Sequence, residues 1–118
     1  MRKEALLIID VQNDYFKNGR CELYQPEKAL MAIKKLLHYF RTKKSSVNYI
    51  QHIVPENADF FAPNTEGVEI SGEIKPLVTE KVITKHYPNS FQKTELQVLL
   101  KKDGITDLVI CGMMTHMC

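Results

Sequence analysis

The chain has 118 residues, of which 44% are apolar and 25% are charged, and its formal net charge is +2 at pH 7. This length predicts one domain, and the composition excludes a disordered chain or a protein that coats nucleic acid. The longest uninterrupted apolar run, Ala5 to Ile9, has five residues, too few to cross a bilayer or to form a signal-peptide core. We therefore expect a cytoplasmic protein without a membrane or nucleic-acid partner.

The apolar run over residues 5–9 predicts the first strand, since an unalternating run is typical of a strand buried on both faces of a parallel sheet. Asp10 closes this strand, and residues 12–25 are rich in turn formers, which indicates a loop. Pro26 then suits the first turn of a helix whose apolar residues recur at spacings of three and four up to Phe40.

A second strand is predicted over residues 47–53, and it is followed by residues 55–80, in which Pro, Gly, Asn and acidic residues interrupt any periodicity. Two adjacent aromatic residues in this stretch, Phe60 and Phe61, favour an ordered lid over a solvated linker. The remaining predicted elements are a strand over residues 82–85, a helix from Thr94 to the C-cap Gly104, and a strand over residues 107–112 that repeats the form of the first.

This order of elements predicts an open parallel α/β sheet with right-handed crossovers. Ligands of such sheets bind beyond the carboxyl ends of the strands. Asp10 closes the first strand, Lys85 closes the third and Cys118 lies past the fourth. We therefore expect the functional site at this edge of the sheet.

The chain has three cysteines, Cys21, Cys111 and Cys118, and an odd number without a secretory signal argues against a disulfide framework. Cys111 stands in an apolar strand and is expected in the core. A thiol with a pKa of about 8.5 is only slightly ionised at pH 7, so a nucleophilic Cys118 would need a base and a cation. Asp10 and Lys85 could supply them, although Asp10 could equally cap a turn and Lys85 could be a solvated strand end.

Three separated segments carry a family resemblance: residues 7–16 (LIIDVQNDYF), residues 85–91 (KHYPNSF) and residues 109–118 (VICGMMTHMC). Together they resemble the isochorismatase-like cysteine hydrolases, which include nicotinamidases. The resemblance implies a Rossmann-like three-layer α/β/α fold with a parallel sheet in the strand order 3-2-1-4-5-6. Residues 1–118 would form the N-terminal two thirds of one such domain, without its last strands.

The resemblance also implies a catalytic triad of Asp10, Lys85 and Cys118. An oxyanion hole would be formed by the backbone N–H groups of Met114 and Cys118, with a cis peptide bond between Met113 and Met114. In the implied mechanism the Cys118 thiolate attacks an amide or related carbonyl, and water then releases the acid from a thioester. Two alternatives remain open: hydrolysis of a vinyl ether, as in isochorismatases, and a non-catalytic fragment or assembly module that keeps the fold.

By analogy with the aromatic residues that sandwich planar substrates in relatives, Tyr15, Phe60 and Phe61 are expected to line the pocket together with His52. Metal-binding relatives carry an Asp-x-His motif after the second strand, whereas this chain has a neutral Gln51 beside His52. One imidazole and an amide make a poor divalent site, so we expect neither a bound metal nor nicotinamide as the substrate. The resemblance further implies a homo-oligomer and no cofactor.

Overall fold

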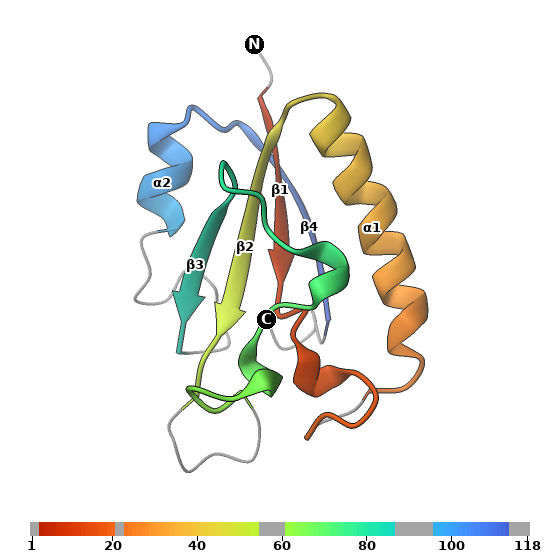
Figure 1. Ribbon diagram of the computed structural model, residues 1–118. Helices are drawn as coiled ribbons and strands as arrows, with labels where there is room; N and C mark the ends of the chain where they lie inside the picture. The colour runs from red at the N-terminus through yellow and green to blue at the C-terminus, as the bar shows by residue number, and fades with distance from the viewer. Residues whose placement is uncertain (1–2, 21–22, 55–60, 87–95, 114–118) are drawn as a thin grey trace.

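The computed structural model describes residues 3–20, 23–54, 61–86 and 96–113, which form a parallel sheet covered by helices on both faces (Figure 1). The strands are β1 (Glu4–Ile9), β2 (Ser46–His52), β3 (Lys81–Lys85) and β4 (Asp107–Gly112), and the α-helices are α1 (Pro26–Thr42) and α2 (Leu96–Lys102). The strands lie in the order β3-β2-β1-β4, and all neighbouring pairs are parallel. The predicted α/β fold and the first four positions of its strand order are confirmed.

Burial of the central strand β1 shows that the fold has three layers, with α1 on one face of the sheet and α2 on the other. Its residues from Ala5 to Ile9 are at most 3% exposed, and alternate side chains point to opposite faces of the sheet. Leu6 and Ile8 pack in the cluster that includes the buried face of α1, whereas Leu7 and Ile9 pack in the cluster that includes α2. The unalternating apolar run is therefore needed because both faces of this strand are covered.

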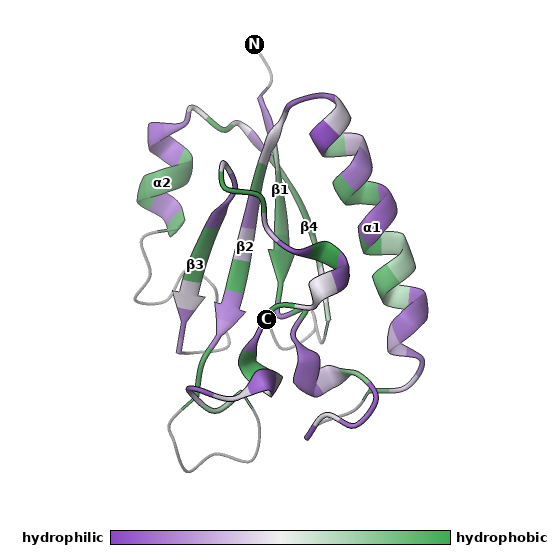
Figure 2. Ribbon diagram, in the orientation of Figure 1, coloured by the Kyte–Doolittle hydropathy of each residue, from purple (hydrophilic) through white to green (hydrophobic). Residues whose placement is uncertain are grey.

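Helix α1 begins at the predicted Pro26 and buries residues at spacings of three and four: Leu30, Ile33, Leu37 and Phe40. Hydrophilic and hydrophobic residues alternate along its ribbon (Figure 2), and most of the residues between the buried ones are exposed. The helix ends where Lys44 adopts a left-handed conformation with φ 56°. No helix in the described part of the chain is both long enough and apolar enough to cross a membrane.

Strand β4 differs from the expectation that it would repeat the form of β1. Its burial alternates, with Leu108 36% exposed and Ile110 54% exposed. Both residues stand beside β1 on the face that carries α2, since Leu108 pairs with Ala5 and Ile110 with Leu7. The physical reason is that α2 buries its apolar residues against β1, β2 and β3, and leaves this part of β4 uncovered within the described residues.

The segment between β2 and β3 is packed where the structure describes it. Residues 61–80 contain two short 3-10 helices, η2 (Glu66–Val68) and η3 (Gly72–Ile74). Val68 is 4% exposed and Ile74 is 1% exposed, and both join the cluster on the α1 face. The order expected for this segment is therefore present over residues 61–80, and its action as a lid stays a prediction.

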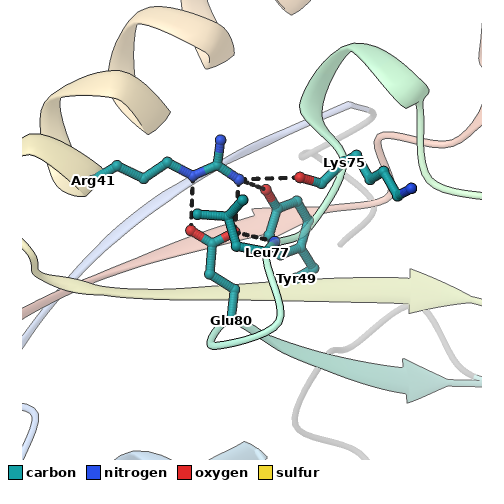
Figure 3. A network of polar contacts seen from close by, with 5 residues as sticks. All are labelled: Arg41, Tyr49, Lys75, Leu77 and Glu80. Atoms are coloured by element: carbon teal, nitrogen blue, oxygen red, sulfur yellow. Dashed lines mark hydrogen bonds and ion pairs between the residues drawn. The ribbon is translucent and has the colours of Figure 1, made fainter.

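A half-buried polar network fastens the end of this segment to α1 (Figure 3). The Arg41 guanidinium donates to both carboxylate oxygens of Glu80, at 2.8 and 2.7 Å, and also to the Tyr49 hydroxyl and the Lys75 carbonyl. The backbone N–H of Leu77 donates to the same carboxylate at 2.9 Å. Burial works to raise the pKa of Glu80, but the hydrogen bonds from Arg41 and Leu77 outweigh it and hold the pKa below its usual range.

Replacing Glu80 by glutamine is expected to lower the free energy of unfolding at pH 7 by about 1.5–3 kcal/mol. The NH2 group of the new amide would face an N–H donor of Arg41, so one hydrogen bond and the charge attraction would be lost. A carboxyl group whose pKa is lowered in the folded state stabilises the fold above its unfolded pKa, and it loses that contribution as the pH falls through the folded value. The difference between the wild-type protein and E80Q should therefore shrink below about pH 4. Urea unfolding at pH 7 and pH 3 measures this.

The matched control is E73Q, because Glu73 pairs with Lys34 at 3.4 Å on the surface, where the two side chains are 63% and 49% exposed. Exposed ion pairs contribute little to stability, so no measurable change is expected in this variant. Equal destabilisation of E80Q and E73Q would show that the network does not hold the segment.

Candidate functional site

The carboxyl ends of β1, β2 and β3 meet at one edge of the sheet, beside the short helices of the connecting loops (Figure 1). Asp10 directly follows β1, His52 ends β2 and Lys85 ends β3. Asp10 has a left-handed backbone with φ 59°, which Asp tolerates better than most residues, and its N–H donates to the Ile50 carbonyl at 3.1 Å. The chain therefore turns out of the strand at Asp10, as predicted for the site.

Asp10 and Lys85 form a fully buried ion pair. The Lys85 Nζ atom lies 3.3 Å from Oδ2 of Asp10, and both side chains are 0% exposed. Lys85 thereby reaches past the end of β2, which lies between β1 and β3 in the sheet. Two charges are rarely buried unless they are paired, so the surroundings of this pair are built to hold it. The structure brings these two predicted catalytic residues together.

His52 is the third polar group at this edge. Its Nδ1 atom lies 3.9 Å from Oδ2 of Asp10, and its side chain is 12% exposed. Burial lowers the pKa of His52, and the charge of Lys85 lowers it further, whereas the charge of Asp10 works in the opposite direction. At pH 7 the imidazole is therefore neutral and can both donate and accept a hydrogen bond.

Tyr15 and Phe61 lie behind this imidazole. Their ring centroids are 4.8 Å apart in an edge-to-face arrangement, and the Phe61 centroid lies 5.8 Å from that of His52. Tyr15 is 4% exposed and Phe61 is 0% exposed. Phe61 therefore packs beside His52, and Tyr15 packs on Phe61, whereas the contact of either ring with a substrate stays a prediction.

The end of β4 approaches the same edge. A Cβ atom on Gly112, where φ is 151°, would lie 2.1 Å from the Ile9 carbonyl oxygen, so only glycine allows this close approach. The next residue, Met113, donates its N–H to the same carbonyl at 3.1 Å. The described end of β4 thus lies next to Ile9, the residue that precedes Asp10. Four predicted features lie outside the described residues: Cys118, Met114, the cis peptide bond between Met113 and Met114, and Phe60.

Two buried polar residues of the loop after β1 were given no role in the sequence analysis. Gln12, 0% exposed, accepts from the N–H of His52 at 2.8 Å and donates to the carbonyls of His52 and Val68 at 2.9 and 2.6 Å. Asp14, 2% exposed, accepts from the N–H of Phe61 at 2.6 Å. Their signal in the sequence is a pair of polar residues two positions apart directly after a buried strand.

Cys111 lies in the core, as predicted. It packs against the cluster on the α1 face, and burial raises the pKa of its thiol to about 11. This cysteine is therefore protonated at neutral pH and inert as a nucleophile. Within the described ranges no three His, Cys, Asp or Glu side chains come together in a way that could hold a metal ion.

Comparisons with known proteins identify the family of the chain. The family model for the isochorismatase domain matches residues 4–118. The uncharacterized isochorismatase family protein YddQ of Bacillus subtilis (strain 168) is 54% identical over 115 residues, which are 97% of this chain and 64% of that protein. This chain therefore spans a little under two thirds of the length of YddQ.

Solved structures repeat the fold. A crystal structure from Oleispira antarctica, assigned as an isochorismatase hydrolase, has a TM-score of 0.94 and 39% identity, and the match covers 99% of this chain and 64% of that one. The N-carbamoylsarcosine amidase of Thermoplasma acidophilum has a TM-score of 0.86 and 25% identity, with 93% of this chain and 67% of that chain covered.

Proposed function

The chain belongs to the isochorismatase domain family, and from this membership we propose that the protein is a cysteine hydrolase that cleaves the C–N bond of a small amide or a related compound. The observation that carries the proposal is the buried ion pair of Asp10 and Lys85, at the same edge of the sheet as Met113, the last described residue of the segment that contains Cys118. An amidase and a protein assigned as a hydrolase among the structural relatives support the class of reaction.

In the proposed mechanism Asp10 accepts the proton of the Cys118 thiol, and the thiolate sulfur attacks the carbonyl carbon of the amide. The backbone N–H groups of Met114 and Cys118 hold the resulting oxyanion. Asp10 then returns its proton to the leaving amine as the C–N bond breaks and a thioester remains. Water, deprotonated by the same carboxylate, attacks the thioester, releases the acid and restores the thiol.

Lys85 and His52 have separate tasks in this scheme. The ammonium group of Lys85 attracts both the Asp10 carboxylate and the developing thiolate, which lowers the cost of holding negative charge in a buried site. The neutral imidazole of His52 would hydrogen-bond the substrate beside Asp10. Tyr15, Phe60 and Phe61 would favour a planar substrate.

Thiol reactivity tests the assignment. We expect Cys118 to titrate below the ordinary thiol value of about 8.5, whereas Cys111, with a pKa of about 11, stays unmodified at pH 8. Chloroacetamide should therefore add one carbamidomethyl group to the peptide that carries Cys118, as measured by mass spectrometry. The adduct and amide hydrolysis should both be absent in C118A, and both should persist in the control C111A.

Three results would contradict parts of the proposal. An adduct that survives in C118A would remove Cys118 from its role as the reactive thiol. Titration of Cys118 as an ordinary thiol would favour a non-catalytic module that keeps the fold. Amide hydrolysis that survives in C118A would exclude a thioester of Cys118, whereas vinyl-ether hydrolysis in C118A would favour the alternative reaction, in which Asp10 donates a proton without a covalent step.

We also propose that the protein acts in the cytoplasm as a homo-oligomer, without a metal or another cofactor. The resemblance to isochorismatase-like hydrolases is what supports the homo-oligomer. Light scattering coupled to gel filtration measures the oligomeric state.

A further inference from the structure

The buried carboxylate of Asp14 joins two loops that are distant in the sequence. Its Oδ1 atom accepts from the N–H of Arg20 at 3.1 Å, within the loop after β1. Its Oδ2 atom accepts from the N–H of Phe61 at 2.6 Å, across 47 positions of the chain. A Cβ atom on Gly67 would lie 1.9 Å from Oδ1, so the segment after β2 also encloses this carboxylate sterically.

The simplest explanation for Asp14 would be a turn-forming residue, since Asp often bonds the backbone of its own loop. The bond to Arg20 fits that explanation, but the bond to Phe61 does not, because it leaves the loop. Phe61 also has a left-handed backbone with φ 53°, a conformation that costs a bulky L-residue about 1–2 kcal/mol. A charge-assisted hydrogen bond to its N–H is strong enough to offset that cost.

The ring that this bond fixes lies against the candidate site. Phe61 packs edge-to-face on Tyr15 and contacts the His52 imidazole, whose Nδ1 atom lies 3.9 Å from Asp10. The backbone of His52 has its own support, because the Gln12 side chain pairs with both its N–H and its carbonyl. The His52 ring has two further supports: a hydrogen bond to the backbone of His86 and the Phe61 ring packed beside it.

We propose that Asp14 is a positioning residue of the site: its carboxylate holds Phe61, and Phe61 holds the His52 imidazole beside Asp10. The inference rests on the proposed function only in treating His52 as part of the site. Asp14 acts through two other residues and is assigned no contact with the substrate.

Loosening Phe61 should admit water to His52, and water stabilises the protonated imidazole. The charged and titratable groups that act on His52 are Asp10, Lys85 and His86. None of them changes when Asp14 is replaced, so the midpoint of the His52 titration reports the packing of Phe61.

The test replaces Asp14 by asparagine, which keeps the shape but puts an NH2 group against one of the two backbone donors. We expect the Phe61 amide to exchange its hydrogen at least about tenfold faster, as measured by NMR, because its buried bond weakens. The midpoint of the His52 titration should rise by about half a pH unit. The control D103N makes the same charge change at the residue that pairs with Lys81, at the start of β3, and should alter neither quantity.

A second variant, F61G, removes the ring and also the conformational cost of the left-handed backbone. F61G alone should raise the His52 midpoint, which keeps the proposal testable if D14N does not fold. In the F61G background, D14N should cause no further rise.

Two outcomes would overturn the proposal: an unchanged His52 midpoint in F61G, or a D14N effect of equal size with and without the Phe61 ring. Neither measurement uses Cys118 or catalysis. An inactive protein with the expected NMR results would therefore reject the proposed hydrolase while leaving the role of Asp14 intact.

Discussion

Replacing Lys85 by methionine is expected to lower the free energy of unfolding by about 3–5 kcal/mol, because the Asp10 carboxylate would stay buried after losing the cation 3.3 Å away. Both side chains are 0% exposed, so water cannot replace the lost interaction without opening the site. Urea unfolding of the wild-type protein and K85M, followed by circular dichroism, measures the difference.

The double variant D10N/K85M separates the lost interaction from lost packing. It removes both charges, and we expect it to recover most of the stability that K85M loses, since a neutral pair carries no charge to desolvate. The control K81M removes a lysine that is paired with Asp103 at a half-exposed position and should have a small effect. If K85M were no less stable than K81M, the buried pair would contribute nothing to the fold.

Replacing Asp10 by asparagine is expected to slow amide hydrolysis by about 100- to 10,000-fold, because the leaving amine and the attacking water both lose their proton carrier. Alkylation of Cys118 by chloroacetamide should fall by less than about tenfold, since it needs only the thiolate, which Lys85 would still attract. The same charge is thus required for one reaction and dispensable for the other. Ammonia release from a panel of small primary amides measures the first rate, and mass spectrometry measures the second.

D103N serves again as the charge-matched control and should leave both rates unchanged. Equal loss of hydrolysis and alkylation in D10N would assign Asp10 to thiolate formation alone. Wild-type hydrolysis in D10N would remove Asp10 from the mechanism.

The sequence predicts those parts of the fold that depend on local pattern. The apolar run of β1 predicts a strand covered on both faces, and the structure buries Ala5 to Ile9 in two separate clusters. The spacing of apolar residues and Pro26 predict helix α1. Asp10 and Lys85 could be predicted as neighbours because parallel strands end at one edge, and the structure pairs them.

Contacts between distant loops could not be predicted in this way. The bond from the Phe61 N–H to Asp14 spans 47 positions, and the bonds from Arg41 to Glu80 span 39. Local propensity carries no information about which backbone group a loop will meet after the sheet has formed. The exposure of Leu108 and Ile110 is also a matter of tertiary contacts, because it depends on how much of β4 helix α2 covers.

The segment between β2 and β3 is anchored at several points, among them Phe61 by Asp14, Val68 by Gln12 and Glu80 by Arg41. The entropic cost of closing a loop between fixed ends grows only slowly with its length. The exposed position Asn64, between the anchors at Phe61 and Val68, can therefore accept substitutions and insertions while the ion pair of Asp10 and Lys85 keeps its place. Such an arrangement separates the part of the chain that evolution can vary from the part that must stay fixed.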